Sequence, residues 1–384
     1  MPGRDRLRVG FVTIWFERGQ SYVTRLIRDS IAERCRTFVF ARTGGVNGQA
    51  KLETQGFWQV PDLTTYPDYQ IPPAVLQQWI RRNRLDVVVF NEEYDFSLVA
   101  AAKQAGAKAV TYLDYYKEDW KPYMGLYDAV LCSSRRAFEL VKDFCPAHYM
   151  GWAVDSRTFR PRPEQPTRYT FFHNAGWLGI GYRKMTPACI LAFDAISRHL
   201  PEATLLVHAQ SPLEMLPPVV QRLVQGNPRI TYRVETVPAP GLYHLGRIMV
   251  MPTKLEGLGL PLFEALACGL PVIVTDAPPM NEFIVPHQTG LLVRVARRVV
   301  RQDNIAFPEE LVDVNHLAET MAWAARHPEE MAEMSRNARL YAEQNLRMDE
   351  LGAKVLAVLQ GLFNEKPTAQ PPIRPLAAGQ GLMP

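Results

Sequence analysis

Strand-like and helix-like patterns alternate along most of this chain of 384 residues, and the alternation limits the folds that it can adopt. Short β-type runs recur in both halves of the chain, with helical patterns between them. The expected strands are residues 7–14, 37–41, 86–90, 108–111 and 129–133, then 170–174, 204–209, 230–233, 248–251, 272–275 and 290–293. Repeated βα units predict parallel sheets covered by helices on both faces. The expected fold is α/β, with two doubly wound, Rossmann-like domains.

A proline-rich break marks the expected domain boundary. Residues 160–168 read Arg-Pro-Arg-Pro-Glu-Gln-Pro-Thr-Arg, a composition that is typical of a linker. We assign residues 1–160 to an N-terminal domain and residues 161–348 to a C-terminal domain. Residues 365–384 are rich in proline and have little apolar periodicity, which predicts a disordered tail.

The composition is that of a globular protein, with 47% hydrophobic and 21% charged residues. Apolar runs fall short of the ~18 residues of a membrane span, and the start of the chain lacks the apolar region of a signal peptide. The five cysteines are scattered, which argues against a zinc site or a disulfide framework. A net charge of +4 does not indicate nucleic-acid binding. We expect a cytoplasmic protein.

Residues 253–275 carry the strongest functional signal. They read as strand end, glycine loop, helix and strand, with Glu256 in the loop and Glu264 in the first turn of a helix over 261–268. Gly257 and Gly259 let the backbone approach a ligand, and the helix start offers free N–H groups to an anion. A carboxylate can accept hydrogen bonds from two neighbouring hydroxyls, as in a sugar or a ribose. The segment therefore predicts a nucleotide-sugar site.

This segment resembles the E-x7-E signature of retaining GT-B glycosyltransferases of the family 4-like group, the glycosyl transferases group 1. The similarity extends to Asn281-Glu282 and to the run Thr289-Gly290-Leu291-Leu292-Val293. Residues 153–161 resemble the hinge between the two domains of that family, and residues 176–184 resemble its phosphate-binding element. The alternative for an isolated E-x7-E is an ordinary βαβ crossover with solvated glutamates.

The resemblance implies roles for individual residues. Glu264 would hold the ribose hydroxyls and Glu256 would lie near the transferred sugar. Lys184 matches the lysine of the phosphate element, and Arg183 would replace an arginine whose position is taken by Trp177. If Arg183 does not replace that arginine, the phosphate site is weakened. The alternative for both residues is that Arg183 and Lys184 are an ordinary basic pair on the surface. The remaining donor-binding candidates are Gly176, Trp177, Gly257, Leu258, Gly259 and Leu260.

The N-terminal half departs from the family pattern. Its glycine-rich turn after the first strand is reduced to Gly19, and Tyr112-Leu113-Asp114 stands where a histidine is often found. Asp114 is a candidate for a polar role toward the acceptor, with an exposed loop aspartate as the alternative. The resemblance also implies that a last helix, about residues 349–364, returns to the N-terminal domain.

The predicted activity is retaining transfer of a hexose from a nucleotide diphosphate sugar, such as UDP- or GDP-hexose, to a sugar, lipid or small-molecule acceptor. The chain has no D-x-D motif, so protein cations are expected to replace a metal. The alternatives are a non-catalytic nucleotide-sugar-binding or partner subunit, and a hydrolase or epimerase on the same fold. A basic run is either a weak peripheral contact with an anionic membrane or a solvated loop. Its members are Arg294, Arg297, Arg298 and Arg301.

Overall fold

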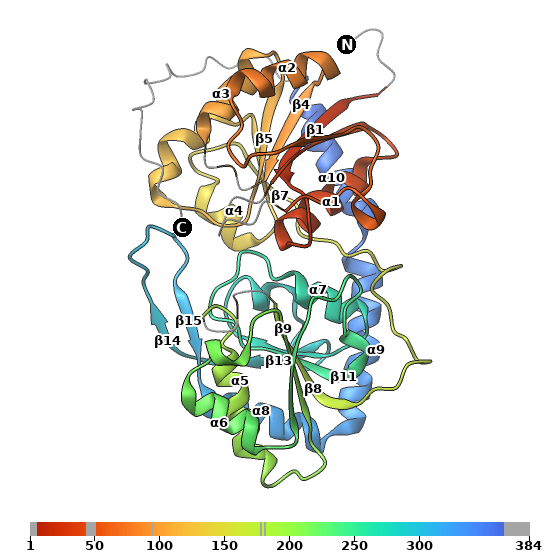
Figure 1. Ribbon diagram of the computed structural model, residues 1–384, viewed down its shortest axis with the longest axis vertical. Coiled ribbons are helices and arrows are strands. Elements are labelled where there is room, and N and C mark those ends of the chain that lie inside the picture. Colours follow the sequence, from red (N-terminus) through yellow and green to blue (C-terminus); the bar gives the residue numbers. More distant parts are fainter. Residues whose placement is uncertain are drawn as a thin grey trace.

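The structure is a computed structural model that describes residues 6–43, 51–91, 93, 95–176, 179 and 182–364. Two lobes lie one above the other in Figure 1, each built on a parallel sheet. The seven-stranded sheet of the N-terminal lobe has the order β3-β2-β1-β4-β5-β6-β7, and the six-stranded sheet of the C-terminal lobe has the order β10-β9-β8-β11-β12-β13. This arrangement confirms the predicted pair of doubly wound α/β units.

The N-terminal lobe follows the predicted alternation closely. Its strands are β1 (Arg8–Ile14), β2 (Arg36–Arg42), β3 (Leu63–Tyr66), β4 (Val87–Asn91), β5 (Lys108–Leu113), β6 (Ala129–Cys132) and β7 (Ala147–Tyr149). Its helices are α1 (Gly19–Ile31), α2 (Pro73–Asn83), α3 (Phe96–Gln104) and α4 (Arg135–Val141), with a 3-10 segment, η3 (Glu118–Leu126). β4 is buried along its whole length, as expected for a central parallel strand with helices on both faces.

The C-terminal lobe contains β8 (Tyr169–Gly176), β9 (Leu205–Ala209), β10 (Ile230–Val234), β11 (Gly246–Met251), β12 (Val272–Thr275) and β13 (Gly290–Val293). Its helices are α5 (Thr186–Ser197), α6 (Pro218–Gly226), α7 (Leu260–Ala267), α8 (Val314–Arg326) and α9 (Pro328–Asn345), and η5 (Tyr243–Leu245) and η6 (Met280–Phe283) are short 3-10 turns. Strands β14 (Val295–Val299) and β15 (Glu309–Val312) form a separate antiparallel hairpin.

The arginines of the basic run lie on or beside strand β14 of this hairpin rather than in a loop, while Arg294, Arg297 and Arg298 are exposed to solvent as expected. Three of them are in ion pairs: Arg294 with Asp313 at 2.7 Å, Arg298 with Glu310 at 2.8 Å, and Arg301 with Glu309 at 2.9 Å. Across the ranges that the structure describes, the helices are too short or too polar to cross a bilayer.

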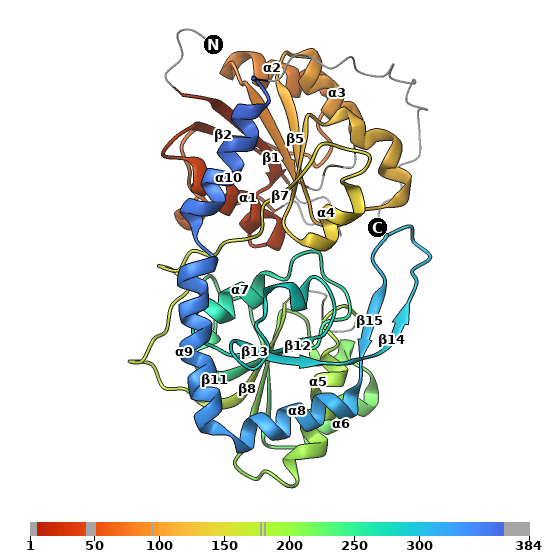
Figure 2. The same cartoon turned by 180° about the vertical axis from the view of Figure 1, so that it is seen from behind.

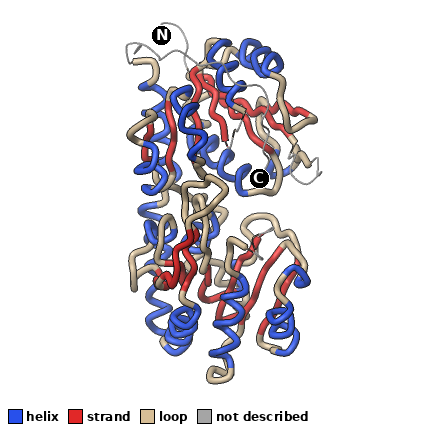
Figure 3. Tube along the Cα trace, turned by 90° about the vertical axis from the view of Figure 1, so that its left-hand side faces the viewer, coloured by secondary structure: helices blue, strands red, loops and turns tan. Residues whose placement is uncertain are grey.

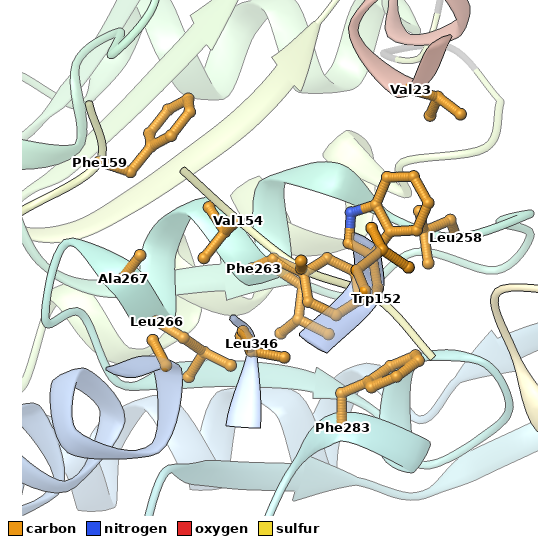
Figure 4. Packing of buried hydrophobic residues seen from close by; sticks show 14 of the residues in the cluster. Val23, Trp152, Val154, Phe159, Leu258, Phe263, Leu266, Ala267, Phe283 and Leu346 are labelled. Atoms are coloured by element: carbon orange, nitrogen blue, oxygen red, sulfur yellow. The ribbon is translucent and has the colours of Figure 1, made fainter. Parts of the chain in front are cut away.

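Apolar packing joins the two lobes (Figure 4). Trp152, Val154 and Phe159 come from the segment between the two sheets and belong to the same buried cluster as Phe263 and Leu266 of α7. The cluster also includes residues of β1 and β4 in the N-terminal lobe. The helix that carries the predicted site is therefore supported by a core that both lobes share.

The last two helices connect the lobes a second time (Figure 2). Helix α9 runs along the C-terminal lobe, and α10 (Met348–Gly361) packs against α1 of the N-terminal lobe. The backbones approach so closely that a Cβ on Gly352 would lie 2.1 Å from the carbonyl oxygen of Ser30. Figure 3 shows the same two-lobed arrangement from the side. The domain limits at residues 160 and 348 stay predictions, and the predicted tail 365–384 lies outside the described residues.

Candidate functional site

The segment that carries the two glutamates folds as predicted into strand, loop, helix and strand. β11 ends at Met251, and α7 begins at Leu260 with Pro261 in its first turn. Gly259 has φ +87°, a backbone conformation that favours glycine. Because the helix starts one residue earlier than predicted, Glu264 is its fifth residue and lies just beyond the first turn. Glu256 lies in the loop before the helix.

Glu256 is the centre of a buried ionic cluster. Its Oε1 lies 2.5 Å from Lys184 Nζ, and its Oε2 lies 3.0 Å from Arg183 Nη1. Thr253 Oγ1 donates a further hydrogen bond to Oε1 at 3.1 Å. Burial alone would raise the pKa of the Glu256 carboxyl, but the charges of Lys184 and Arg183 outweigh it and hold the pKa below its ordinary value. Glu256 is therefore ionised at neutral pH.

Backbone hydrogen bonds hold the two cations beside the glutamate loop. The carbonyl oxygen of Arg183 accepts from Lys254 N at 2.9 Å. Lys184 N donates to Gly179 O at 2.9 Å. Lys184 and Glu256 are each only 6% exposed, so the alternative of an ordinary surface pair does not describe Lys184.

Glu264 belongs to α7 and is half-buried. It accepts a hydrogen bond from the hydroxyl of Tyr243, which in turn accepts one from Asn174 Nδ2 at 3.3 Å. Burial raises the pKa of Glu264 to about 7, although the Tyr243 hydrogen bond and the Lys184 charge oppose the rise. The two glutamates thus differ, with Glu256 held ionised and Glu264 titrating near neutrality.

The N-terminal lobe contributes the residues that face this cluster. Tyr115 OH accepts from Arg183 Nη1 at 3.2 Å. Asp114 is half-buried against Gly257, where a Cβ would lie 1.8 Å from Asp114 Oδ1, so only glycine fits at position 257 in this arrangement. A Cβ on Gly19 would lie 3.9 Å from Leu260 Cδ1. The structure therefore brings both acceptor-side candidates against the glycine loop and the start of α7.

The remaining predicted residues have different surroundings. Gly176 ends β8 with φ +63°, and its carbonyl accepts from Gln210 N at 3.0 Å. The side chain of Leu258 is 2% exposed and belongs to the core that the lobes share, so Leu258 can offer a ligand only its backbone. Trp177 lies outside the described residues.

Sequence reasoning missed two side chains at this site. Tyr243 comes from η5 and reaches Glu264. Arg136, in the first turn of α4, donates to the backbone carbonyl of Glu256 and, at 2.7 Å, to Pro278 O. Glu282 of η6 accepts from the backbone N–H groups of Arg135 and Arg136 at 2.6 and 3.0 Å. Glu282 belongs to the Asn281-Glu282 pair that resembles the family sequence. No local pattern signals Arg136, because its partners are distant in sequence.

A small pocket beside Asp114 is lined by Glu93, Tyr115 and Trp120, among others. Glu93, one of the lining residues, pairs with Arg42 of β2 at 3.0 Å. Within the described part of the chain, no group of three or more His, Cys, Asp or Glu residues is arranged to hold a metal ion.

Residues 176–303 match the family model described as glycosyl transferases group 1. A D-inositol 3-phosphate glycosyltransferase from Gordonia bronchialis is 28% identical over 117 residues, which are 30% of this chain and 22% of that protein. The same enzyme from Rhodococcus erythropolis is 33% identical over 147 residues, 36% of this chain and 33% of that protein. The matched stretches thus span a third or less of these curated relatives.

Solved structures share the whole fold. A sucrose-phosphate synthase from Thermosynechococcus elongatus has a TM-score of 0.67 at 17% identity and covers 94% of this chain and 100% of its own. Anabaena HepE in complex with UDP and glucose has a TM-score of 0.70 at 13% identity, with 93% and 100% covered. At these identities the likeness concerns the fold. The chain has the GT-B fold, and its residues 176–303 match the family model of the glycosyl transferases group 1.

Proposed function

We propose that this protein is a retaining glycosyltransferase that moves a hexose from a nucleotide diphosphate sugar to a sugar, lipid or small-molecule acceptor. The observation that carries the proposal is the buried Glu256 held by Lys184 and Arg183 beside Glu264, at the start of α7 and opposite the N-terminal lobe. The names of the relatives support glycosyl transfer, and the UDP and glucose bound to Anabaena HepE support a nucleotide-sugar donor.

The cluster suits a diphosphate leaving group. Negative charge develops on the phosphate oxygens as the bond to the sugar breaks, and fixed cations and oriented N–H groups stabilise that charge. Lys184 and Arg183 supply the cations, and the first turn of α7 supplies N–H groups. Glu264 would accept hydrogen bonds from the ribose hydroxyls, and Glu256 would accept them from the sugar.

The same groups allow transfer with retention of configuration. The acceptor oxygen bonds to the anomeric carbon on the same face of the sugar from which the phosphate oxygen leaves. The leaving phosphate oxygen takes the proton of the acceptor hydroxyl. No enzyme nucleophile is needed. Both carboxylate oxygens of Glu256 are engaged by cations, which suits a group that orients the donor rather than one that attacks it.

The acceptor would enter from the N-terminal lobe. Asp114 lies against Gly257, and Tyr115 contacts Arg183, so an acceptor bound beside them would lie close to the transferred sugar. The pocket lined by Tyr115 and Trp120 offers aromatic surface for a sugar ring. Arg183, which pairs with Glu256, would supply the cation that Trp177 had put in doubt, and this argues against a non-catalytic nucleotide-sugar-binding subunit.

A panel assay tests the proposal. The protein is incubated with UDP- and GDP-hexoses, and release of nucleoside diphosphate is followed with and without candidate acceptors, with Glu256→Gln as the matched inactive variant. Acceptor-dependent release by the wild type, and product with the anomeric configuration of the donor by NMR, would support the proposal. Tight binding of a nucleotide sugar without any turnover would favour the binding subunit instead.

A further inference from the structure

The segment between β14 and β15, residues 300–308, extends from the C-terminal lobe to the N-terminal lobe (Figures 1 and 2). We call it the strap. Its middle forms an antiparallel bridge between Ile305 and Lys117. Two backbone hydrogen bonds frame the bridge, from Glu118 N to Asn304 O at 3.1 Å and from Ala306 N to Tyr116 O at 3.0 Å. The strap thus adds a strand-like connection across the two lobes.

Phe307 anchors the strap. It is 1% exposed and belongs to a core cluster that is otherwise built almost entirely from the N-terminal lobe. Its ring lies 6.1 Å from that of Tyr115 between centroids, and the guanidinium of Arg136 stacks over it at 3.8 Å. These two neighbours reach the candidate site, because Tyr115 contacts Arg183 and Arg136 donates to the carbonyl of Glu256.

The base of the strap is tied to the same loop. Glu310 N donates to Lys254 O at 2.8 Å, and Lys254 Nζ pairs with Glu309 at 2.8 Å. Arg301 donates to the hydroxyl of Tyr182 at 2.5 Å, one residue before Arg183. The base of the strap therefore contacts the loop that carries Glu256. The tip of the strap contacts Tyr115 and Arg136, which face that loop.

We propose that Phe307 is a positioning residue for the donor site: it holds Arg136 against the backbone carbonyl of Glu256, and so fixes Glu256 between Lys184 and Arg183. The inference rests on the proposed function for its catalytic consequence. Its structural consequence, a rigid loop 253–257, does not depend on that function.

Three variants test it. Phe307→Ala removes the anchor, Phe307→Leu keeps apolar volume but removes the ring face under Arg136, and Val300→Ala is the matched control, because Val300 is 83% exposed. Each is compared with the full-length wild type by thermal unfolding, by amide hydrogen exchange of residues 253–257 and 304–306, and by kcat and donor KM. The donor is the nucleotide sugar with the fastest turnover in the panel.

We expect Phe307→Ala to lower kcat by about 10- to 100-fold, since displacement of a reacting group by ~1 Å can cost about 100-fold. The donor KM should change by less than about threefold, because Lys184, Arg183 and Glu264 remain to bind the donor. Amide hydrogen exchange should become faster in residues 253–257 and in residues 304–306. Phe307→Leu should leave 304–306 protected and still raise exchange in 253–257. Val300→Ala should match the wild type in every measurement.

Unchanged exchange in 253–257 for both Phe307 variants would overturn the inference, as would faster exchange with unchanged kcat. If Phe307→Ala does not fold, Phe307→Leu decides by the same readouts. If the wild type turns over no nucleotide sugar, the proposed function fails, and the exchange arm alone then supports or overturns the positioning role.

Discussion

Lys184 Nζ lies 2.5 Å from Glu256 Oε1, and both residues are only 6% exposed. The contact excludes, for Lys184, the alternative of an ordinary basic pair on the surface. In a buried pair, removal of one partner leaves the other charge uncompensated, which costs much more than loss of a surface ion pair. The same contact that serves the proposed chemistry therefore also contributes to the fold.

Lys184→Ala should accordingly destabilise the protein as well as lower turnover. We expect a loss in the free energy of unfolding toward the lower end of the roughly 3–5 kcal/mol typical of broken buried pairs, because Arg183 still contacts Glu256. Urea unfolding measures the loss. In the double variant Lys184→Ala/Glu256→Gln, the carboxylate charge is removed and part of the stability should return. Strictly additive losses in the double variant would contradict a direct pair.

Glu264→Ala should weaken nucleotide binding. Each ribose hydroxyl left without an acceptor costs about 1–3 kcal/mol, so loss of the contacts to both hydroxyls should raise Kd by roughly 30-fold or more. Calorimetry with UDP and with its 2′-deoxy analogue makes the test specific to the ribose. The wild type should discriminate between the two ligands, and the variant should not. If the folded variant binds both ligands with the affinity of the wild type, Glu264 does not bind the ribose.

The raised pKa of Glu264 also predicts a pH dependence of stability. Its folded pKa of about 7 exceeds the ordinary value of 4.5, so between these values the folded state binds more protons than the unfolded state. The contribution of Glu264 to stability is therefore greatest below pH 4.5 and is lost as the pH rises to about 7. Glu264→Gln should raise Tm relative to the wild type more at about pH 8 than at about pH 5. Glu329→Gln, at an exposed position, serves as the control. An equal change in Tm at both pH values for Glu264→Gln would disprove the raised pKa of Glu264.

In the N-terminal sheet the central strands were easier to predict from the sequence than the edge strands, whereas both edge strands of the C-terminal sheet, β10 and β13, were in the expected set. The central strands, such as β4 with Val-Val-Val-Phe, are continuous apolar runs because helices cover both faces. The edge strands β3 and β7 are absent from the expected set, because they are short and half-exposed and their residues form no such run. The hairpin β14–β15 differs from the expected loop, because its arginines find partners on the opposite strand that no local pattern reveals.

The same distinction holds for the candidate site. The segment around Glu256 and Glu264 is local, and its glycines and proline specify its turns, so it could be recognised from the sequence. Arg136 and Phe307 reach the site only because the lobes close on one another. Long-range contacts of this kind depend on the packing of both lobes, which spacing along the chain does not encode.

A further prediction about the site concerns metals. Because Lys184, Arg183 and the N–H groups of α7 are proposed to meet the diphosphate charge, turnover should be unaffected by EDTA. The assay is nucleoside diphosphate release before and after chelation, with desalted protein as the control. Loss of turnover that magnesium or manganese restores would refute the metal-free mechanism. The carboxylates to test would then be Glu92, Glu93 and Asp114, of which Glu92 lies outside the described residues.

The contact of α10 with α1 predicts a sharp difference between two glycines of one helix. At Gly352 a Cβ would lie 2.1 Å from the carbonyl oxygen of Ser30, and a backbone atom cannot move aside without shifting the helix. Gly352→Ala should therefore lower the free energy of unfolding by about 1–3 kcal/mol, as overpacked sites do.

Gly361→Ala is the matched control. A Cβ at Gly361 would meet no atom within 4 Å among the described residues beyond its own stretch of helix, and alanine favours a helix, so stability should be unchanged or slightly higher. Urea unfolding compares the two variants, and amide exchange along α10 locates the effect. If the contact with α1 holds α10 in place, exchange should rise along α10 in Gly352→Ala alone. Equal stability of the two variants would mean that α10 does not press against α1 in solution.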